Sequence, residues 1–155
     1  MRALIVLAPL VLAACGSAEE STTIGGTTFA QNEAEGTATI SNERGSITSL
    51  EGSSAESTQF PEFAPRYPGS AIESALVTNS ERGERTVVML NTNDDIGKVM
   101  DFYRDRFTSA GLEIGMNVTA EDTGMISAEG DGKKASVTGS KQDGKTVFSV
   151  SFRGS

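Results

Sequence analysis

The chain of 155 residues contains no histidine, no tryptophan and a single cysteine, Cys15. Without histidine, the commonest general acid–base group is missing, and serine–histidine or cysteine–histidine nucleophile pairs cannot form. A zinc or copper site would also lack its usual nitrogen and sulfur ligands. One cysteine allows no disulfide within the chain. These absences argue against an enzyme, and we expect no catalytic residue, no cofactor and no bound metal.

Positive charge is scarce as well, because 13 Lys and Arg residues face 21 Asp and Glu residues and the net charge is −8. An acidic surface repels phosphate backbones, so no nucleic acid partner is expected. Residues 139–146 match the GxxxxGK[ST] pattern of a phosphate loop. Such a loop must lead from a strand into a helix. Here a β-rich stretch follows, so we interpret the match as a hairpin turn and expect no nucleotide.

The first 15 residues have the pattern of a secretion signal. Arg2 precedes an apolar run that is too short to span a bilayer and that ends in Leu12-Ala13-Ala14-Cys15. This ending resembles the lipobox of bacterial lipoproteins, in which a diacylglycerol is attached to the cysteine and the peptide is cut before it. The resemblance implies a signal peptide over residues 1–14, lipidation of Cys15 and anchorage of the chain to a membrane.

Gly16 follows the cysteine. In lipoproteins of enteric-type bacteria, an Asp at this place favours retention in the inner membrane. Gly16 therefore resembles the outer-membrane class, and we expect a lipid-anchored protein on the outer membrane, facing the periplasm.

The next segments are polar and short of apolar residues. Residues 15–36 are small and aperiodic, which predicts a flexible tether behind the lipidated cysteine. Residues 37–59 hold two short β-like runs around Asn42-Glu43-Arg44-Gly45 and then a serine-rich stretch, which predicts a hairpin and a linker. An isolated hairpin is marginally stable, so it could dock on the main domain, pair with a partner or stay unfolded.

An aromatic and proline-rich segment begins at Phe60. Three of the four prolines and three of the nine aromatic residues lie in residues 60–69, with Phe63 and Tyr67 as the other two aromatics. One interpretation is a docking peptide for another protein. The other is a strap that buries these rings in its own domain, which is favoured because large apolar groups are seldom left exposed. Phe102, beside a predicted helix, is a fourth candidate for contact with a partner.

Residues 60–155 predict a small α+β domain. Apolar residues recur at helical spacing up to about Ala110, and Gly111 is a natural helix stop. Two β-rich runs precede this helix and four follow it, the last with strict alternation around Phe148, Val150 and Phe152. The predicted fold class is α+β, with one helix packed on a curved antiparallel sheet in the order β-β-α-β-β-β-β.

Residues 67–112 resemble small uncharacterised domains of bacterial exported proteins. The resemblance lies in Tyr67-Pro68-Gly69-Ser70, similar to a Tyr-Pro-Gly-Ala start, and in an aromatic-Tyr helix that ends in Ala110-Gly111. It implies a fold and no activity.

Three hypotheses of function follow from these patterns. The first is a membrane-anchored envelope lipoprotein whose non-catalytic domain has a binding or structural role. Its partner would be another envelope protein, peptidoglycan or a second copy of itself. The second is a carrier or sensor of a small apolar, lipid-like ligand held in the groove between helix and sheet. An enzyme is the third and is disfavoured by the missing histidine and reactive cysteine.

Overall fold

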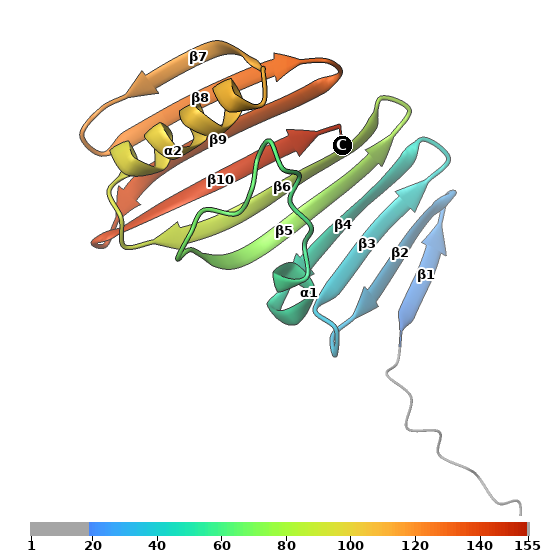
Figure 1. Cartoon of the computed structure of the whole chain (residues 1–155). Coiled ribbons are helices and arrows are strands. Elements are labelled where there is room, and N and C mark those ends of the chain that lie inside the picture. Colours follow the sequence, from blue (N-terminus) through green and yellow to red (C-terminus); the bar gives the residue numbers. More distant parts are fainter. Residues whose placement is uncertain (1–18, 155) are drawn as a thin grey trace, which may run out of the picture.

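A computed structural model describes residues 19–154. Its frame is one antiparallel sheet of ten strands in the order β1-β2-β3-β4-β5-β6-β10-β9-β8-β7, so β10 inserts between β6 and β9 (Figure 1). The strands are β1 (Glu20–Ile24), β2 (Thr27–Asn32), β3 (Thr37–Asn42), β4 (Gly45–Glu51), β5 (Ala71–Ser80), β6 (Gly83–Thr92), β7 (Glu113–Thr119), β8 (Thr123–Gly130), β9 (Lys133–Gln142) and β10 (Lys145–Arg153). The helices are α1 (Gly52–Glu56) and α2 (Ile96–Ser109).

The predicted fold class, one helix on a curved sheet in the order β-β-α-β-β-β-β, is wrong for this chain. The sheet has ten strands rather than six, and a second, short helix follows the fourth strand. The difference lies in the polar N-terminal segments, which contribute β1 to β4. A strand forms through hydrogen bonds between backbones, and Thr-rich polar segments can make these bonds with few apolar residues.

The predicted flexible tether, residues 15–36, contains two of these strands. β1 and β2 pair from Glu20↔Gln31 to Ile24↔Thr27, joined by Gly25 and Gly26. Both glycines have positive φ, 58° and 78°. Two such residues between paired strands make the tight hairpin turn that matches the strand twist, and glycine adopts it without steric cost.

Of the predicted hairpin and linker, residues 37–59, the hairpin is also part of the sheet. β3 and β4 pair from Thr37↔Leu50 to Asn42↔Gly45. β4 then pairs with β5 along its length, from Gly45↔Ser80 to Glu51↔Ser74, which joins the first four strands to the other six. The stretch predicted as linker contains α1, which packs on β4 and β5 and buries Ala55.

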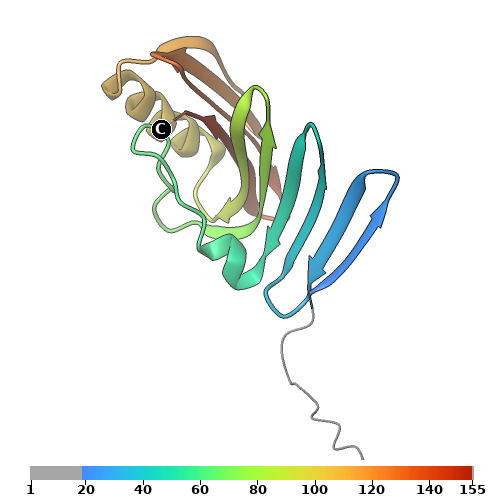
Figure 2. The ribbon, with the colours of Figure 1, turned by 90° about the vertical axis from the view of Figure 1, so that its right-hand side faces the viewer.

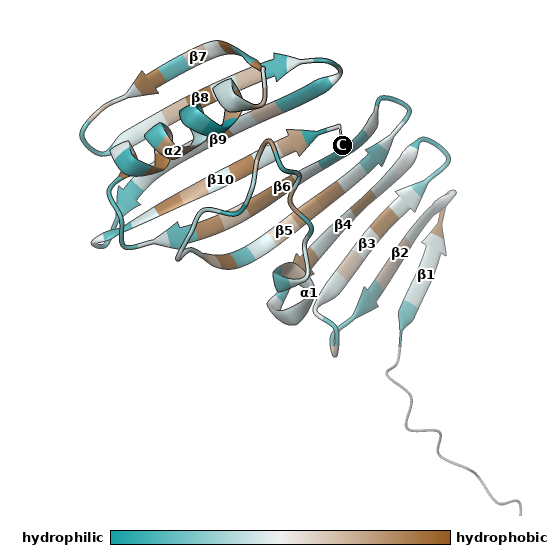
Figure 3. Ribbon diagram, in the orientation of Figure 1, coloured by the Kyte–Doolittle hydropathy of each residue, from teal (hydrophilic) through white to brown (hydrophobic). Residues whose placement is uncertain are grey.

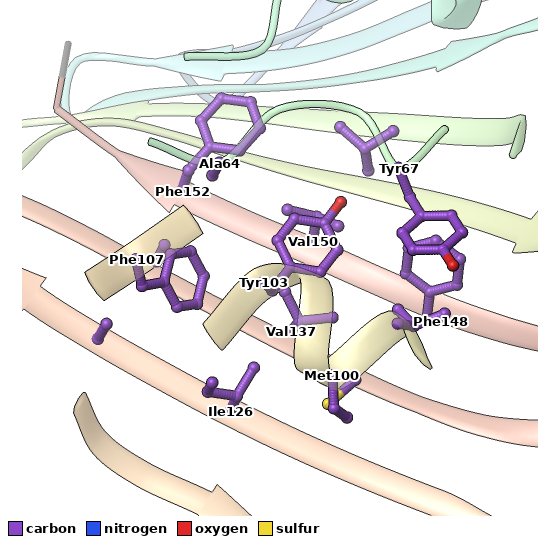
Figure 4. Close-up of a cluster of buried hydrophobic side chains, with 14 of the residues drawn as sticks. Ala64, Tyr67, Met100, Tyr103, Phe107, Ile126, Val137, Phe148, Val150 and Phe152 are labelled. Atoms are coloured by element: carbon purple, nitrogen blue, oxygen red, sulfur yellow. The ribbon is translucent and has the colours of Figure 1, made fainter. Parts of the chain in front are cut away.

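Both helices and the segment 57–70 lie on the same side of the sheet (Figures 1 and 2). α2 packs across β7, β8 and β9. Its apolar stripe supplies five buried residues, and the facing strands supply most of the remainder of the core (Figure 4). The buried stripe of α2 is Ile96, Val99, Met100, Tyr103 and Phe107.

The segment 57–70, here called the strap, crosses the same side of the sheet beside α2. Phe63 and Tyr67 are buried, 4% and 7% exposed. The Tyr103 hydroxyl donates a hydrogen bond of 2.9 Å to the Pro65 carbonyl, which fixes the strap to the middle of α2. Because proline has no backbone N–H, Pro65 can take part in a backbone hydrogen bond only through its carbonyl oxygen, which accepts.

Candidate ligand-binding site

The space between α2 and the sheet is filled by side chains. Tyr103 and Phe107 are fully buried, and the facing Phe148 is 1% exposed (Figure 4). The Tyr103 ring lies 5.9 Å from that of Phe107 and 6.4 Å from that of Phe148, measured between centroids. Close-packed interiors leave few voids larger than a water molecule. A ligand between α2 and the sheet would therefore have to displace core side chains.

A pocket of about 610 Å³ instead lies at the end of this layer, where the strap begins. Its apolar lining is Phe60 and Pro61 from the strap and Phe152 from β10. The rings of Phe60 and Phe152 lie 5.7 Å apart and tilted by 45°. Small-molecule sites have volumes of about 300–1,000 Å³ and mostly apolar linings. This pocket, here called the end pocket, has both properties.

Three glycines shape the remaining lining. Gly83 is the first residue of β6, Gly132 lies in the β8–β9 turn, and Gly154 ends the described chain. A Cβ at Gly154 would lie 2.9 Å from the Gly132 carbonyl oxygen, so only glycine allows these two segments to approach this closely. A Cβ at Gly83 or Gly132 would meet nothing within 4 Å, which leaves open space toward the pocket or solvent.

Two arginines complete the end pocket. Arg82, in the β5–β6 turn, and Arg153, the last residue of β10, both line it, together with one carboxylate, Glu84. Among residues 19–154, neither guanidinium has a carboxylate oxygen within 4 Å. Guanidinium groups bind carboxylates and phosphates through paired N–H donors. An apolar pocket lined by two such groups suits an amphiphile with an anionic head.

The candidate partner-contact residues take three different places. Phe60 lines the end pocket, whereas Phe63 and Tyr67 belong to the core. Phe102 is half-buried on the flank of α2, with its ring edge-to-face against those of Tyr67 and Tyr103, both at 5.1 Å. The structure therefore brings only Phe60 to the candidate site. Cys15, the predicted lipidation site, lies outside the described residues.

Other polar patterns lie away from the end pocket. Residues 139–146, which match the phosphate-loop pattern, span the end of β9, the turn at Asp143 and Gly144, and the start of β10. No group of three or more acidic, His or Cys side chains able to hold a metal ion occurs in residues 19–154. In the same part of the chain, neither helix is long and apolar enough to cross a bilayer.

The strap is held at its far end by a hydrogen-bonded acid. The Tyr67 hydroxyl donates to Asp94 Oδ2 at 2.9 Å, and Lys98 Nζ donates to Asp94 Oδ1 at 3.1 Å. Burial, and then the bond to the Asp94 carboxylate, raise the pKa of Tyr67 from 10.0 to about 12. The Lys98 and Tyr67 donors lower the pKa of Asp94, which keeps this acceptor ionised near neutral pH.

This arrangement predicts loss of stability at alkaline pH. The pKa of Tyr67 is about 12 in the folded protein, and in the unfolded chain it is about 10. The contribution of Tyr67 to the free energy of unfolding is therefore fully present below pH ~10. It is lost as the pH rises through the pKa of Tyr67 in the folded protein. Burial also raises the pKa of Tyr103, the other tyrosine, above its usual range. We expect Tyr67→Phe to reduce, and not abolish, the alkaline loss in denaturant titrations. An unchanged pH dependence would contradict this account of Tyr67.

Sequence patterns reveal only part of the end pocket. Phe60 stands out in the aromatic strap, and Phe152 and Arg153 end the alternation of the last strand. Nothing in the sequence shows that Arg82, 70 residues earlier than Phe152, meets them. The pocket depends on the insertion of β10 beside β6, which places the β5–β6 turn next to the end of β10.

Comparison with known proteins gives one match. No curated protein and no solved structure matches the chain. A family model does match, over a segment from the second residue of β5 to the first residue of β10. Over residues 72–145, just under half of its length, the chain is similar to the family described as START domain-like.

Proposed function

We propose that this chain is a lipid-anchored, non-catalytic module of the bacterial cell envelope that binds an anionic amphiphile in the end pocket. The observation that carries the proposal is the joining of Phe60, Pro61 and Phe152 with Arg82 and Arg153 in one pocket of about 610 Å³. Similarity to the START domain-like family is consistent with a ligand-binding domain. The end pocket replaces the helix–sheet groove as the proposed site, because core side chains fill that groove.

The proposed anchor is the lipidated Cys15, which follows the lipobox-like sequence Leu12-Ala13-Ala14. Four residues separate Cys15 from the start of β1 at Glu20. A chain extends by at most about 3.6 Å per residue, so the five steps from Cys15 to Glu20 reach about 18 Å. The module would then lie close to the headgroups, with the outer membrane as its proposed site because of Gly16. This proximity suits a ligand drawn from a membrane.

The chemistry of the proposed ligand can be tested with two probes of equal chain length, decanoate and decanol. The full-length chain should bind decanoate more tightly than decanol, because only decanoate offers a carboxylate to Arg82 and Arg153. Removing one charge-assisted hydrogen bond costs about 1.5–3 kcal/mol. We therefore expect Arg153→Gln to weaken decanoate binding by about 10- to 100-fold in calorimetry. Decanol binding should change little.

Two further variants separate the apolar and charged parts of the end pocket. Phe60→Ala should weaken both probes, because its half-buried ring is part of the apolar wall. Arg44→Gln is the matched control, since Arg44 lies in the exposed β3–β4 turn, outside the end pocket. If Arg44→Gln and Arg153→Gln weakened decanoate binding equally, the preference for decanoate would come from the net charge of the protein and not from contacts in the end pocket. Absence of binding by the unmodified chain would refute the proposal.

A further inference from the structure

The sheet exposes its apolar side chains on one face only. Among residues 19–154, eight large hydrophobic residues are at least 40% exposed, and cross-strand register places all of them on the face away from α2 and the strap. They are Ile24, Phe29, Ile40, Ile47, Leu76, Met116, Val118 and Met125.

Five of these residues form a continuous row over neighbouring strands. Ile40 lies directly opposite Phe29 on one side and Ile47 on the other. Ile24 and Leu76 extend the row onto β1 and β5, with exposures of 68% and 40%. Directly opposed side chains lie about 5 Å apart, and diagonal neighbours lie about 7–8 Å apart. Ile24 is a diagonal neighbour of Phe29, and Leu76 is a diagonal neighbour of Ile47, so the five residues form one contiguous patch. These five residues are here called the N-terminal open face.

Three of the five strands beneath this face, β1 to β3, have no apolar core on their other side. On the α2 side, the strand register gives β1 to β3 small and polar groups, among them Thr23, Thr28 and Thr39. Neither helix nor strap crosses these three strands (Figures 1 and 3). A Thr23–Thr28 hydrogen bond of 2.9 Å and a Thr39–Thr48 hydrogen bond of 2.9 Å link neighbouring strands there. Sheets gain independent stability by packing an apolar face. The only apolar face that β1 to β3 offer is the exposed one.

The N-terminal open face is also nearly free of charge. The residues of β1 to β5 that share its side of the sheet include three ionisable groups, Glu20, Glu51 and Glu73, all at or near a strand end. The chain as a whole carries a net charge of −8. Two copies would repel through most of their surface, but not through this face. Depletion of charge is typical of the core of protein interfaces.

We infer that the N-terminal open face packs against the same face of a second copy of this chain. Two antiparallel sheets stack face to face about 10 Å apart, with apolar side chains interdigitating. Five strands at ~4.8 Å and six residues at ~3.4 Å cover about 490 Å² per copy, or about 980 Å² for two. This approaches the ~1,000 Å² of a specific interface. A two-fold dimer buries the N-terminal open face of both copies at once, because the same residues meet across the symmetry axis.

The inference is tested by the mass of the full-length chain in density-matched detergent micelles, measured by sedimentation equilibrium over a concentration series. The expected result is a reversible dimer. Ile40→Lys should weaken association by about 100-fold or more, since it places like charges together at the axis. The matched control is Val118→Lys, because Val118 is 59% exposed on the same face but lies on β7, at the other edge of the sheet. It should remain dimeric.

A charge-reversed pair distinguishes a broken interface from a misfolded sheet. Ile40→Lys and Ile40→Glu chains should each be monomeric, and a mixture of the two should form the mixed dimer. Misfolded variants would not recover association on mixing. A monomeric unmodified chain at every concentration, or Ile40 variants that dimerise like the parent, would overturn the inference. Dimers that are disrupted by Val118→Lys and not by Ile40→Lys would place the interface at the other edge and also overturn it.

Discussion

Replacing Phe107 by alanine is expected to lower the free energy of unfolding by about 3–5 kcal/mol, the usual cost of removing a buried phenylalanine. Phe107 is fully buried in the last turn of α2, and its ring lies 5.9 Å from that of Tyr103. Domains of this size have a total stability of about 5–15 kcal/mol. Phe107→Ala should therefore leave the domain marginal, which urea unfolding followed by circular dichroism would show as a large fall in the midpoint.

The control for this effect is Val118→Ala. Val118 is an apolar residue of β7 with 59% of its surface exposed, so its truncation leaves no cavity. Surface substitutions usually change stability by less than about 0.5 kcal/mol. Comparable losses for Phe107→Ala and Val118→Ala would contradict the position assigned to α2, with its stripe turned toward the sheet.

Gly139→Ala is expected to destabilise the fold by about 1–3 kcal/mol, the usual cost of forcing atoms into a packed core. A Cβ at Gly139 would lie 2.5 Å from Phe148 Cβ and 2.9 Å from the Val147 carbonyl oxygen. Both contacts are to atoms close to or in the backbone of β10, which cannot move without distorting the pairing of β9 with β10. The same Cβ would lie 3.0 Å from Ile96 Cδ1, so the glycine also makes room for the start of α2.

Two other glycines make this prediction specific. Gly115→Ala should be nearly neutral in urea unfolding, because its Cβ would meet only Ser127 Oγ, at an ordinary 3.8 Å. Gly124→Ala should fall between the two, because its nearest contact, Met100 Cγ at 2.6 Å, belongs to a flexible side chain. An order of effects other than Gly139, Gly124, Gly115 would contradict the described packing of α2 on β8 and β9.

The part of the fold that sequence patterns predict is the part with strong periodicity. The helical spacing from Ile96 to Phe107 produces α2, because a stripe of this kind must be buried. The strict alternation of Phe148, Val150 and Phe152 produces β10, with all three side chains facing α2. For both α2 and β10, local propensity and burial favour the same structure, so the sequence pattern alone predicts the element.

β1 and β2 were not predictable from apolar periodicity, because they bury almost nothing. All five residues of β1 are exposed, and its single large apolar residue, Ile24, is 68% exposed. The sequence signals that were present are the threonine-rich runs and the Gly25-Gly26 pair between them, a hairpin turn. Low hydrophobicity led to the prediction of a flexible tether, whereas cross-strand pairing onto β3 makes this segment an extension of the sheet.

The candidate site was even less accessible to sequence analysis. The predicted groove under α2 is occupied by rings such as Tyr103, which follows from the same stripe that predicted the helix. The end pocket arises where two turns, the end of β10 and the strap meet, and its residues are spread from Gln59 to Gly154. Such a site follows from strand order, which single-sequence patterns do not determine.

The most direct test of ligand binding in the end pocket is an amide NMR titration of the isotope-labelled full-length chain with decanoate. The account predicts saturable shifts confined to the strap around Phe60, the β5–β6 turn at Arg82 and residues 152–154. Shifts spread along the N-terminal open face, or the absence of saturable shifts at Phe60, Arg82 and Arg153, would contradict it.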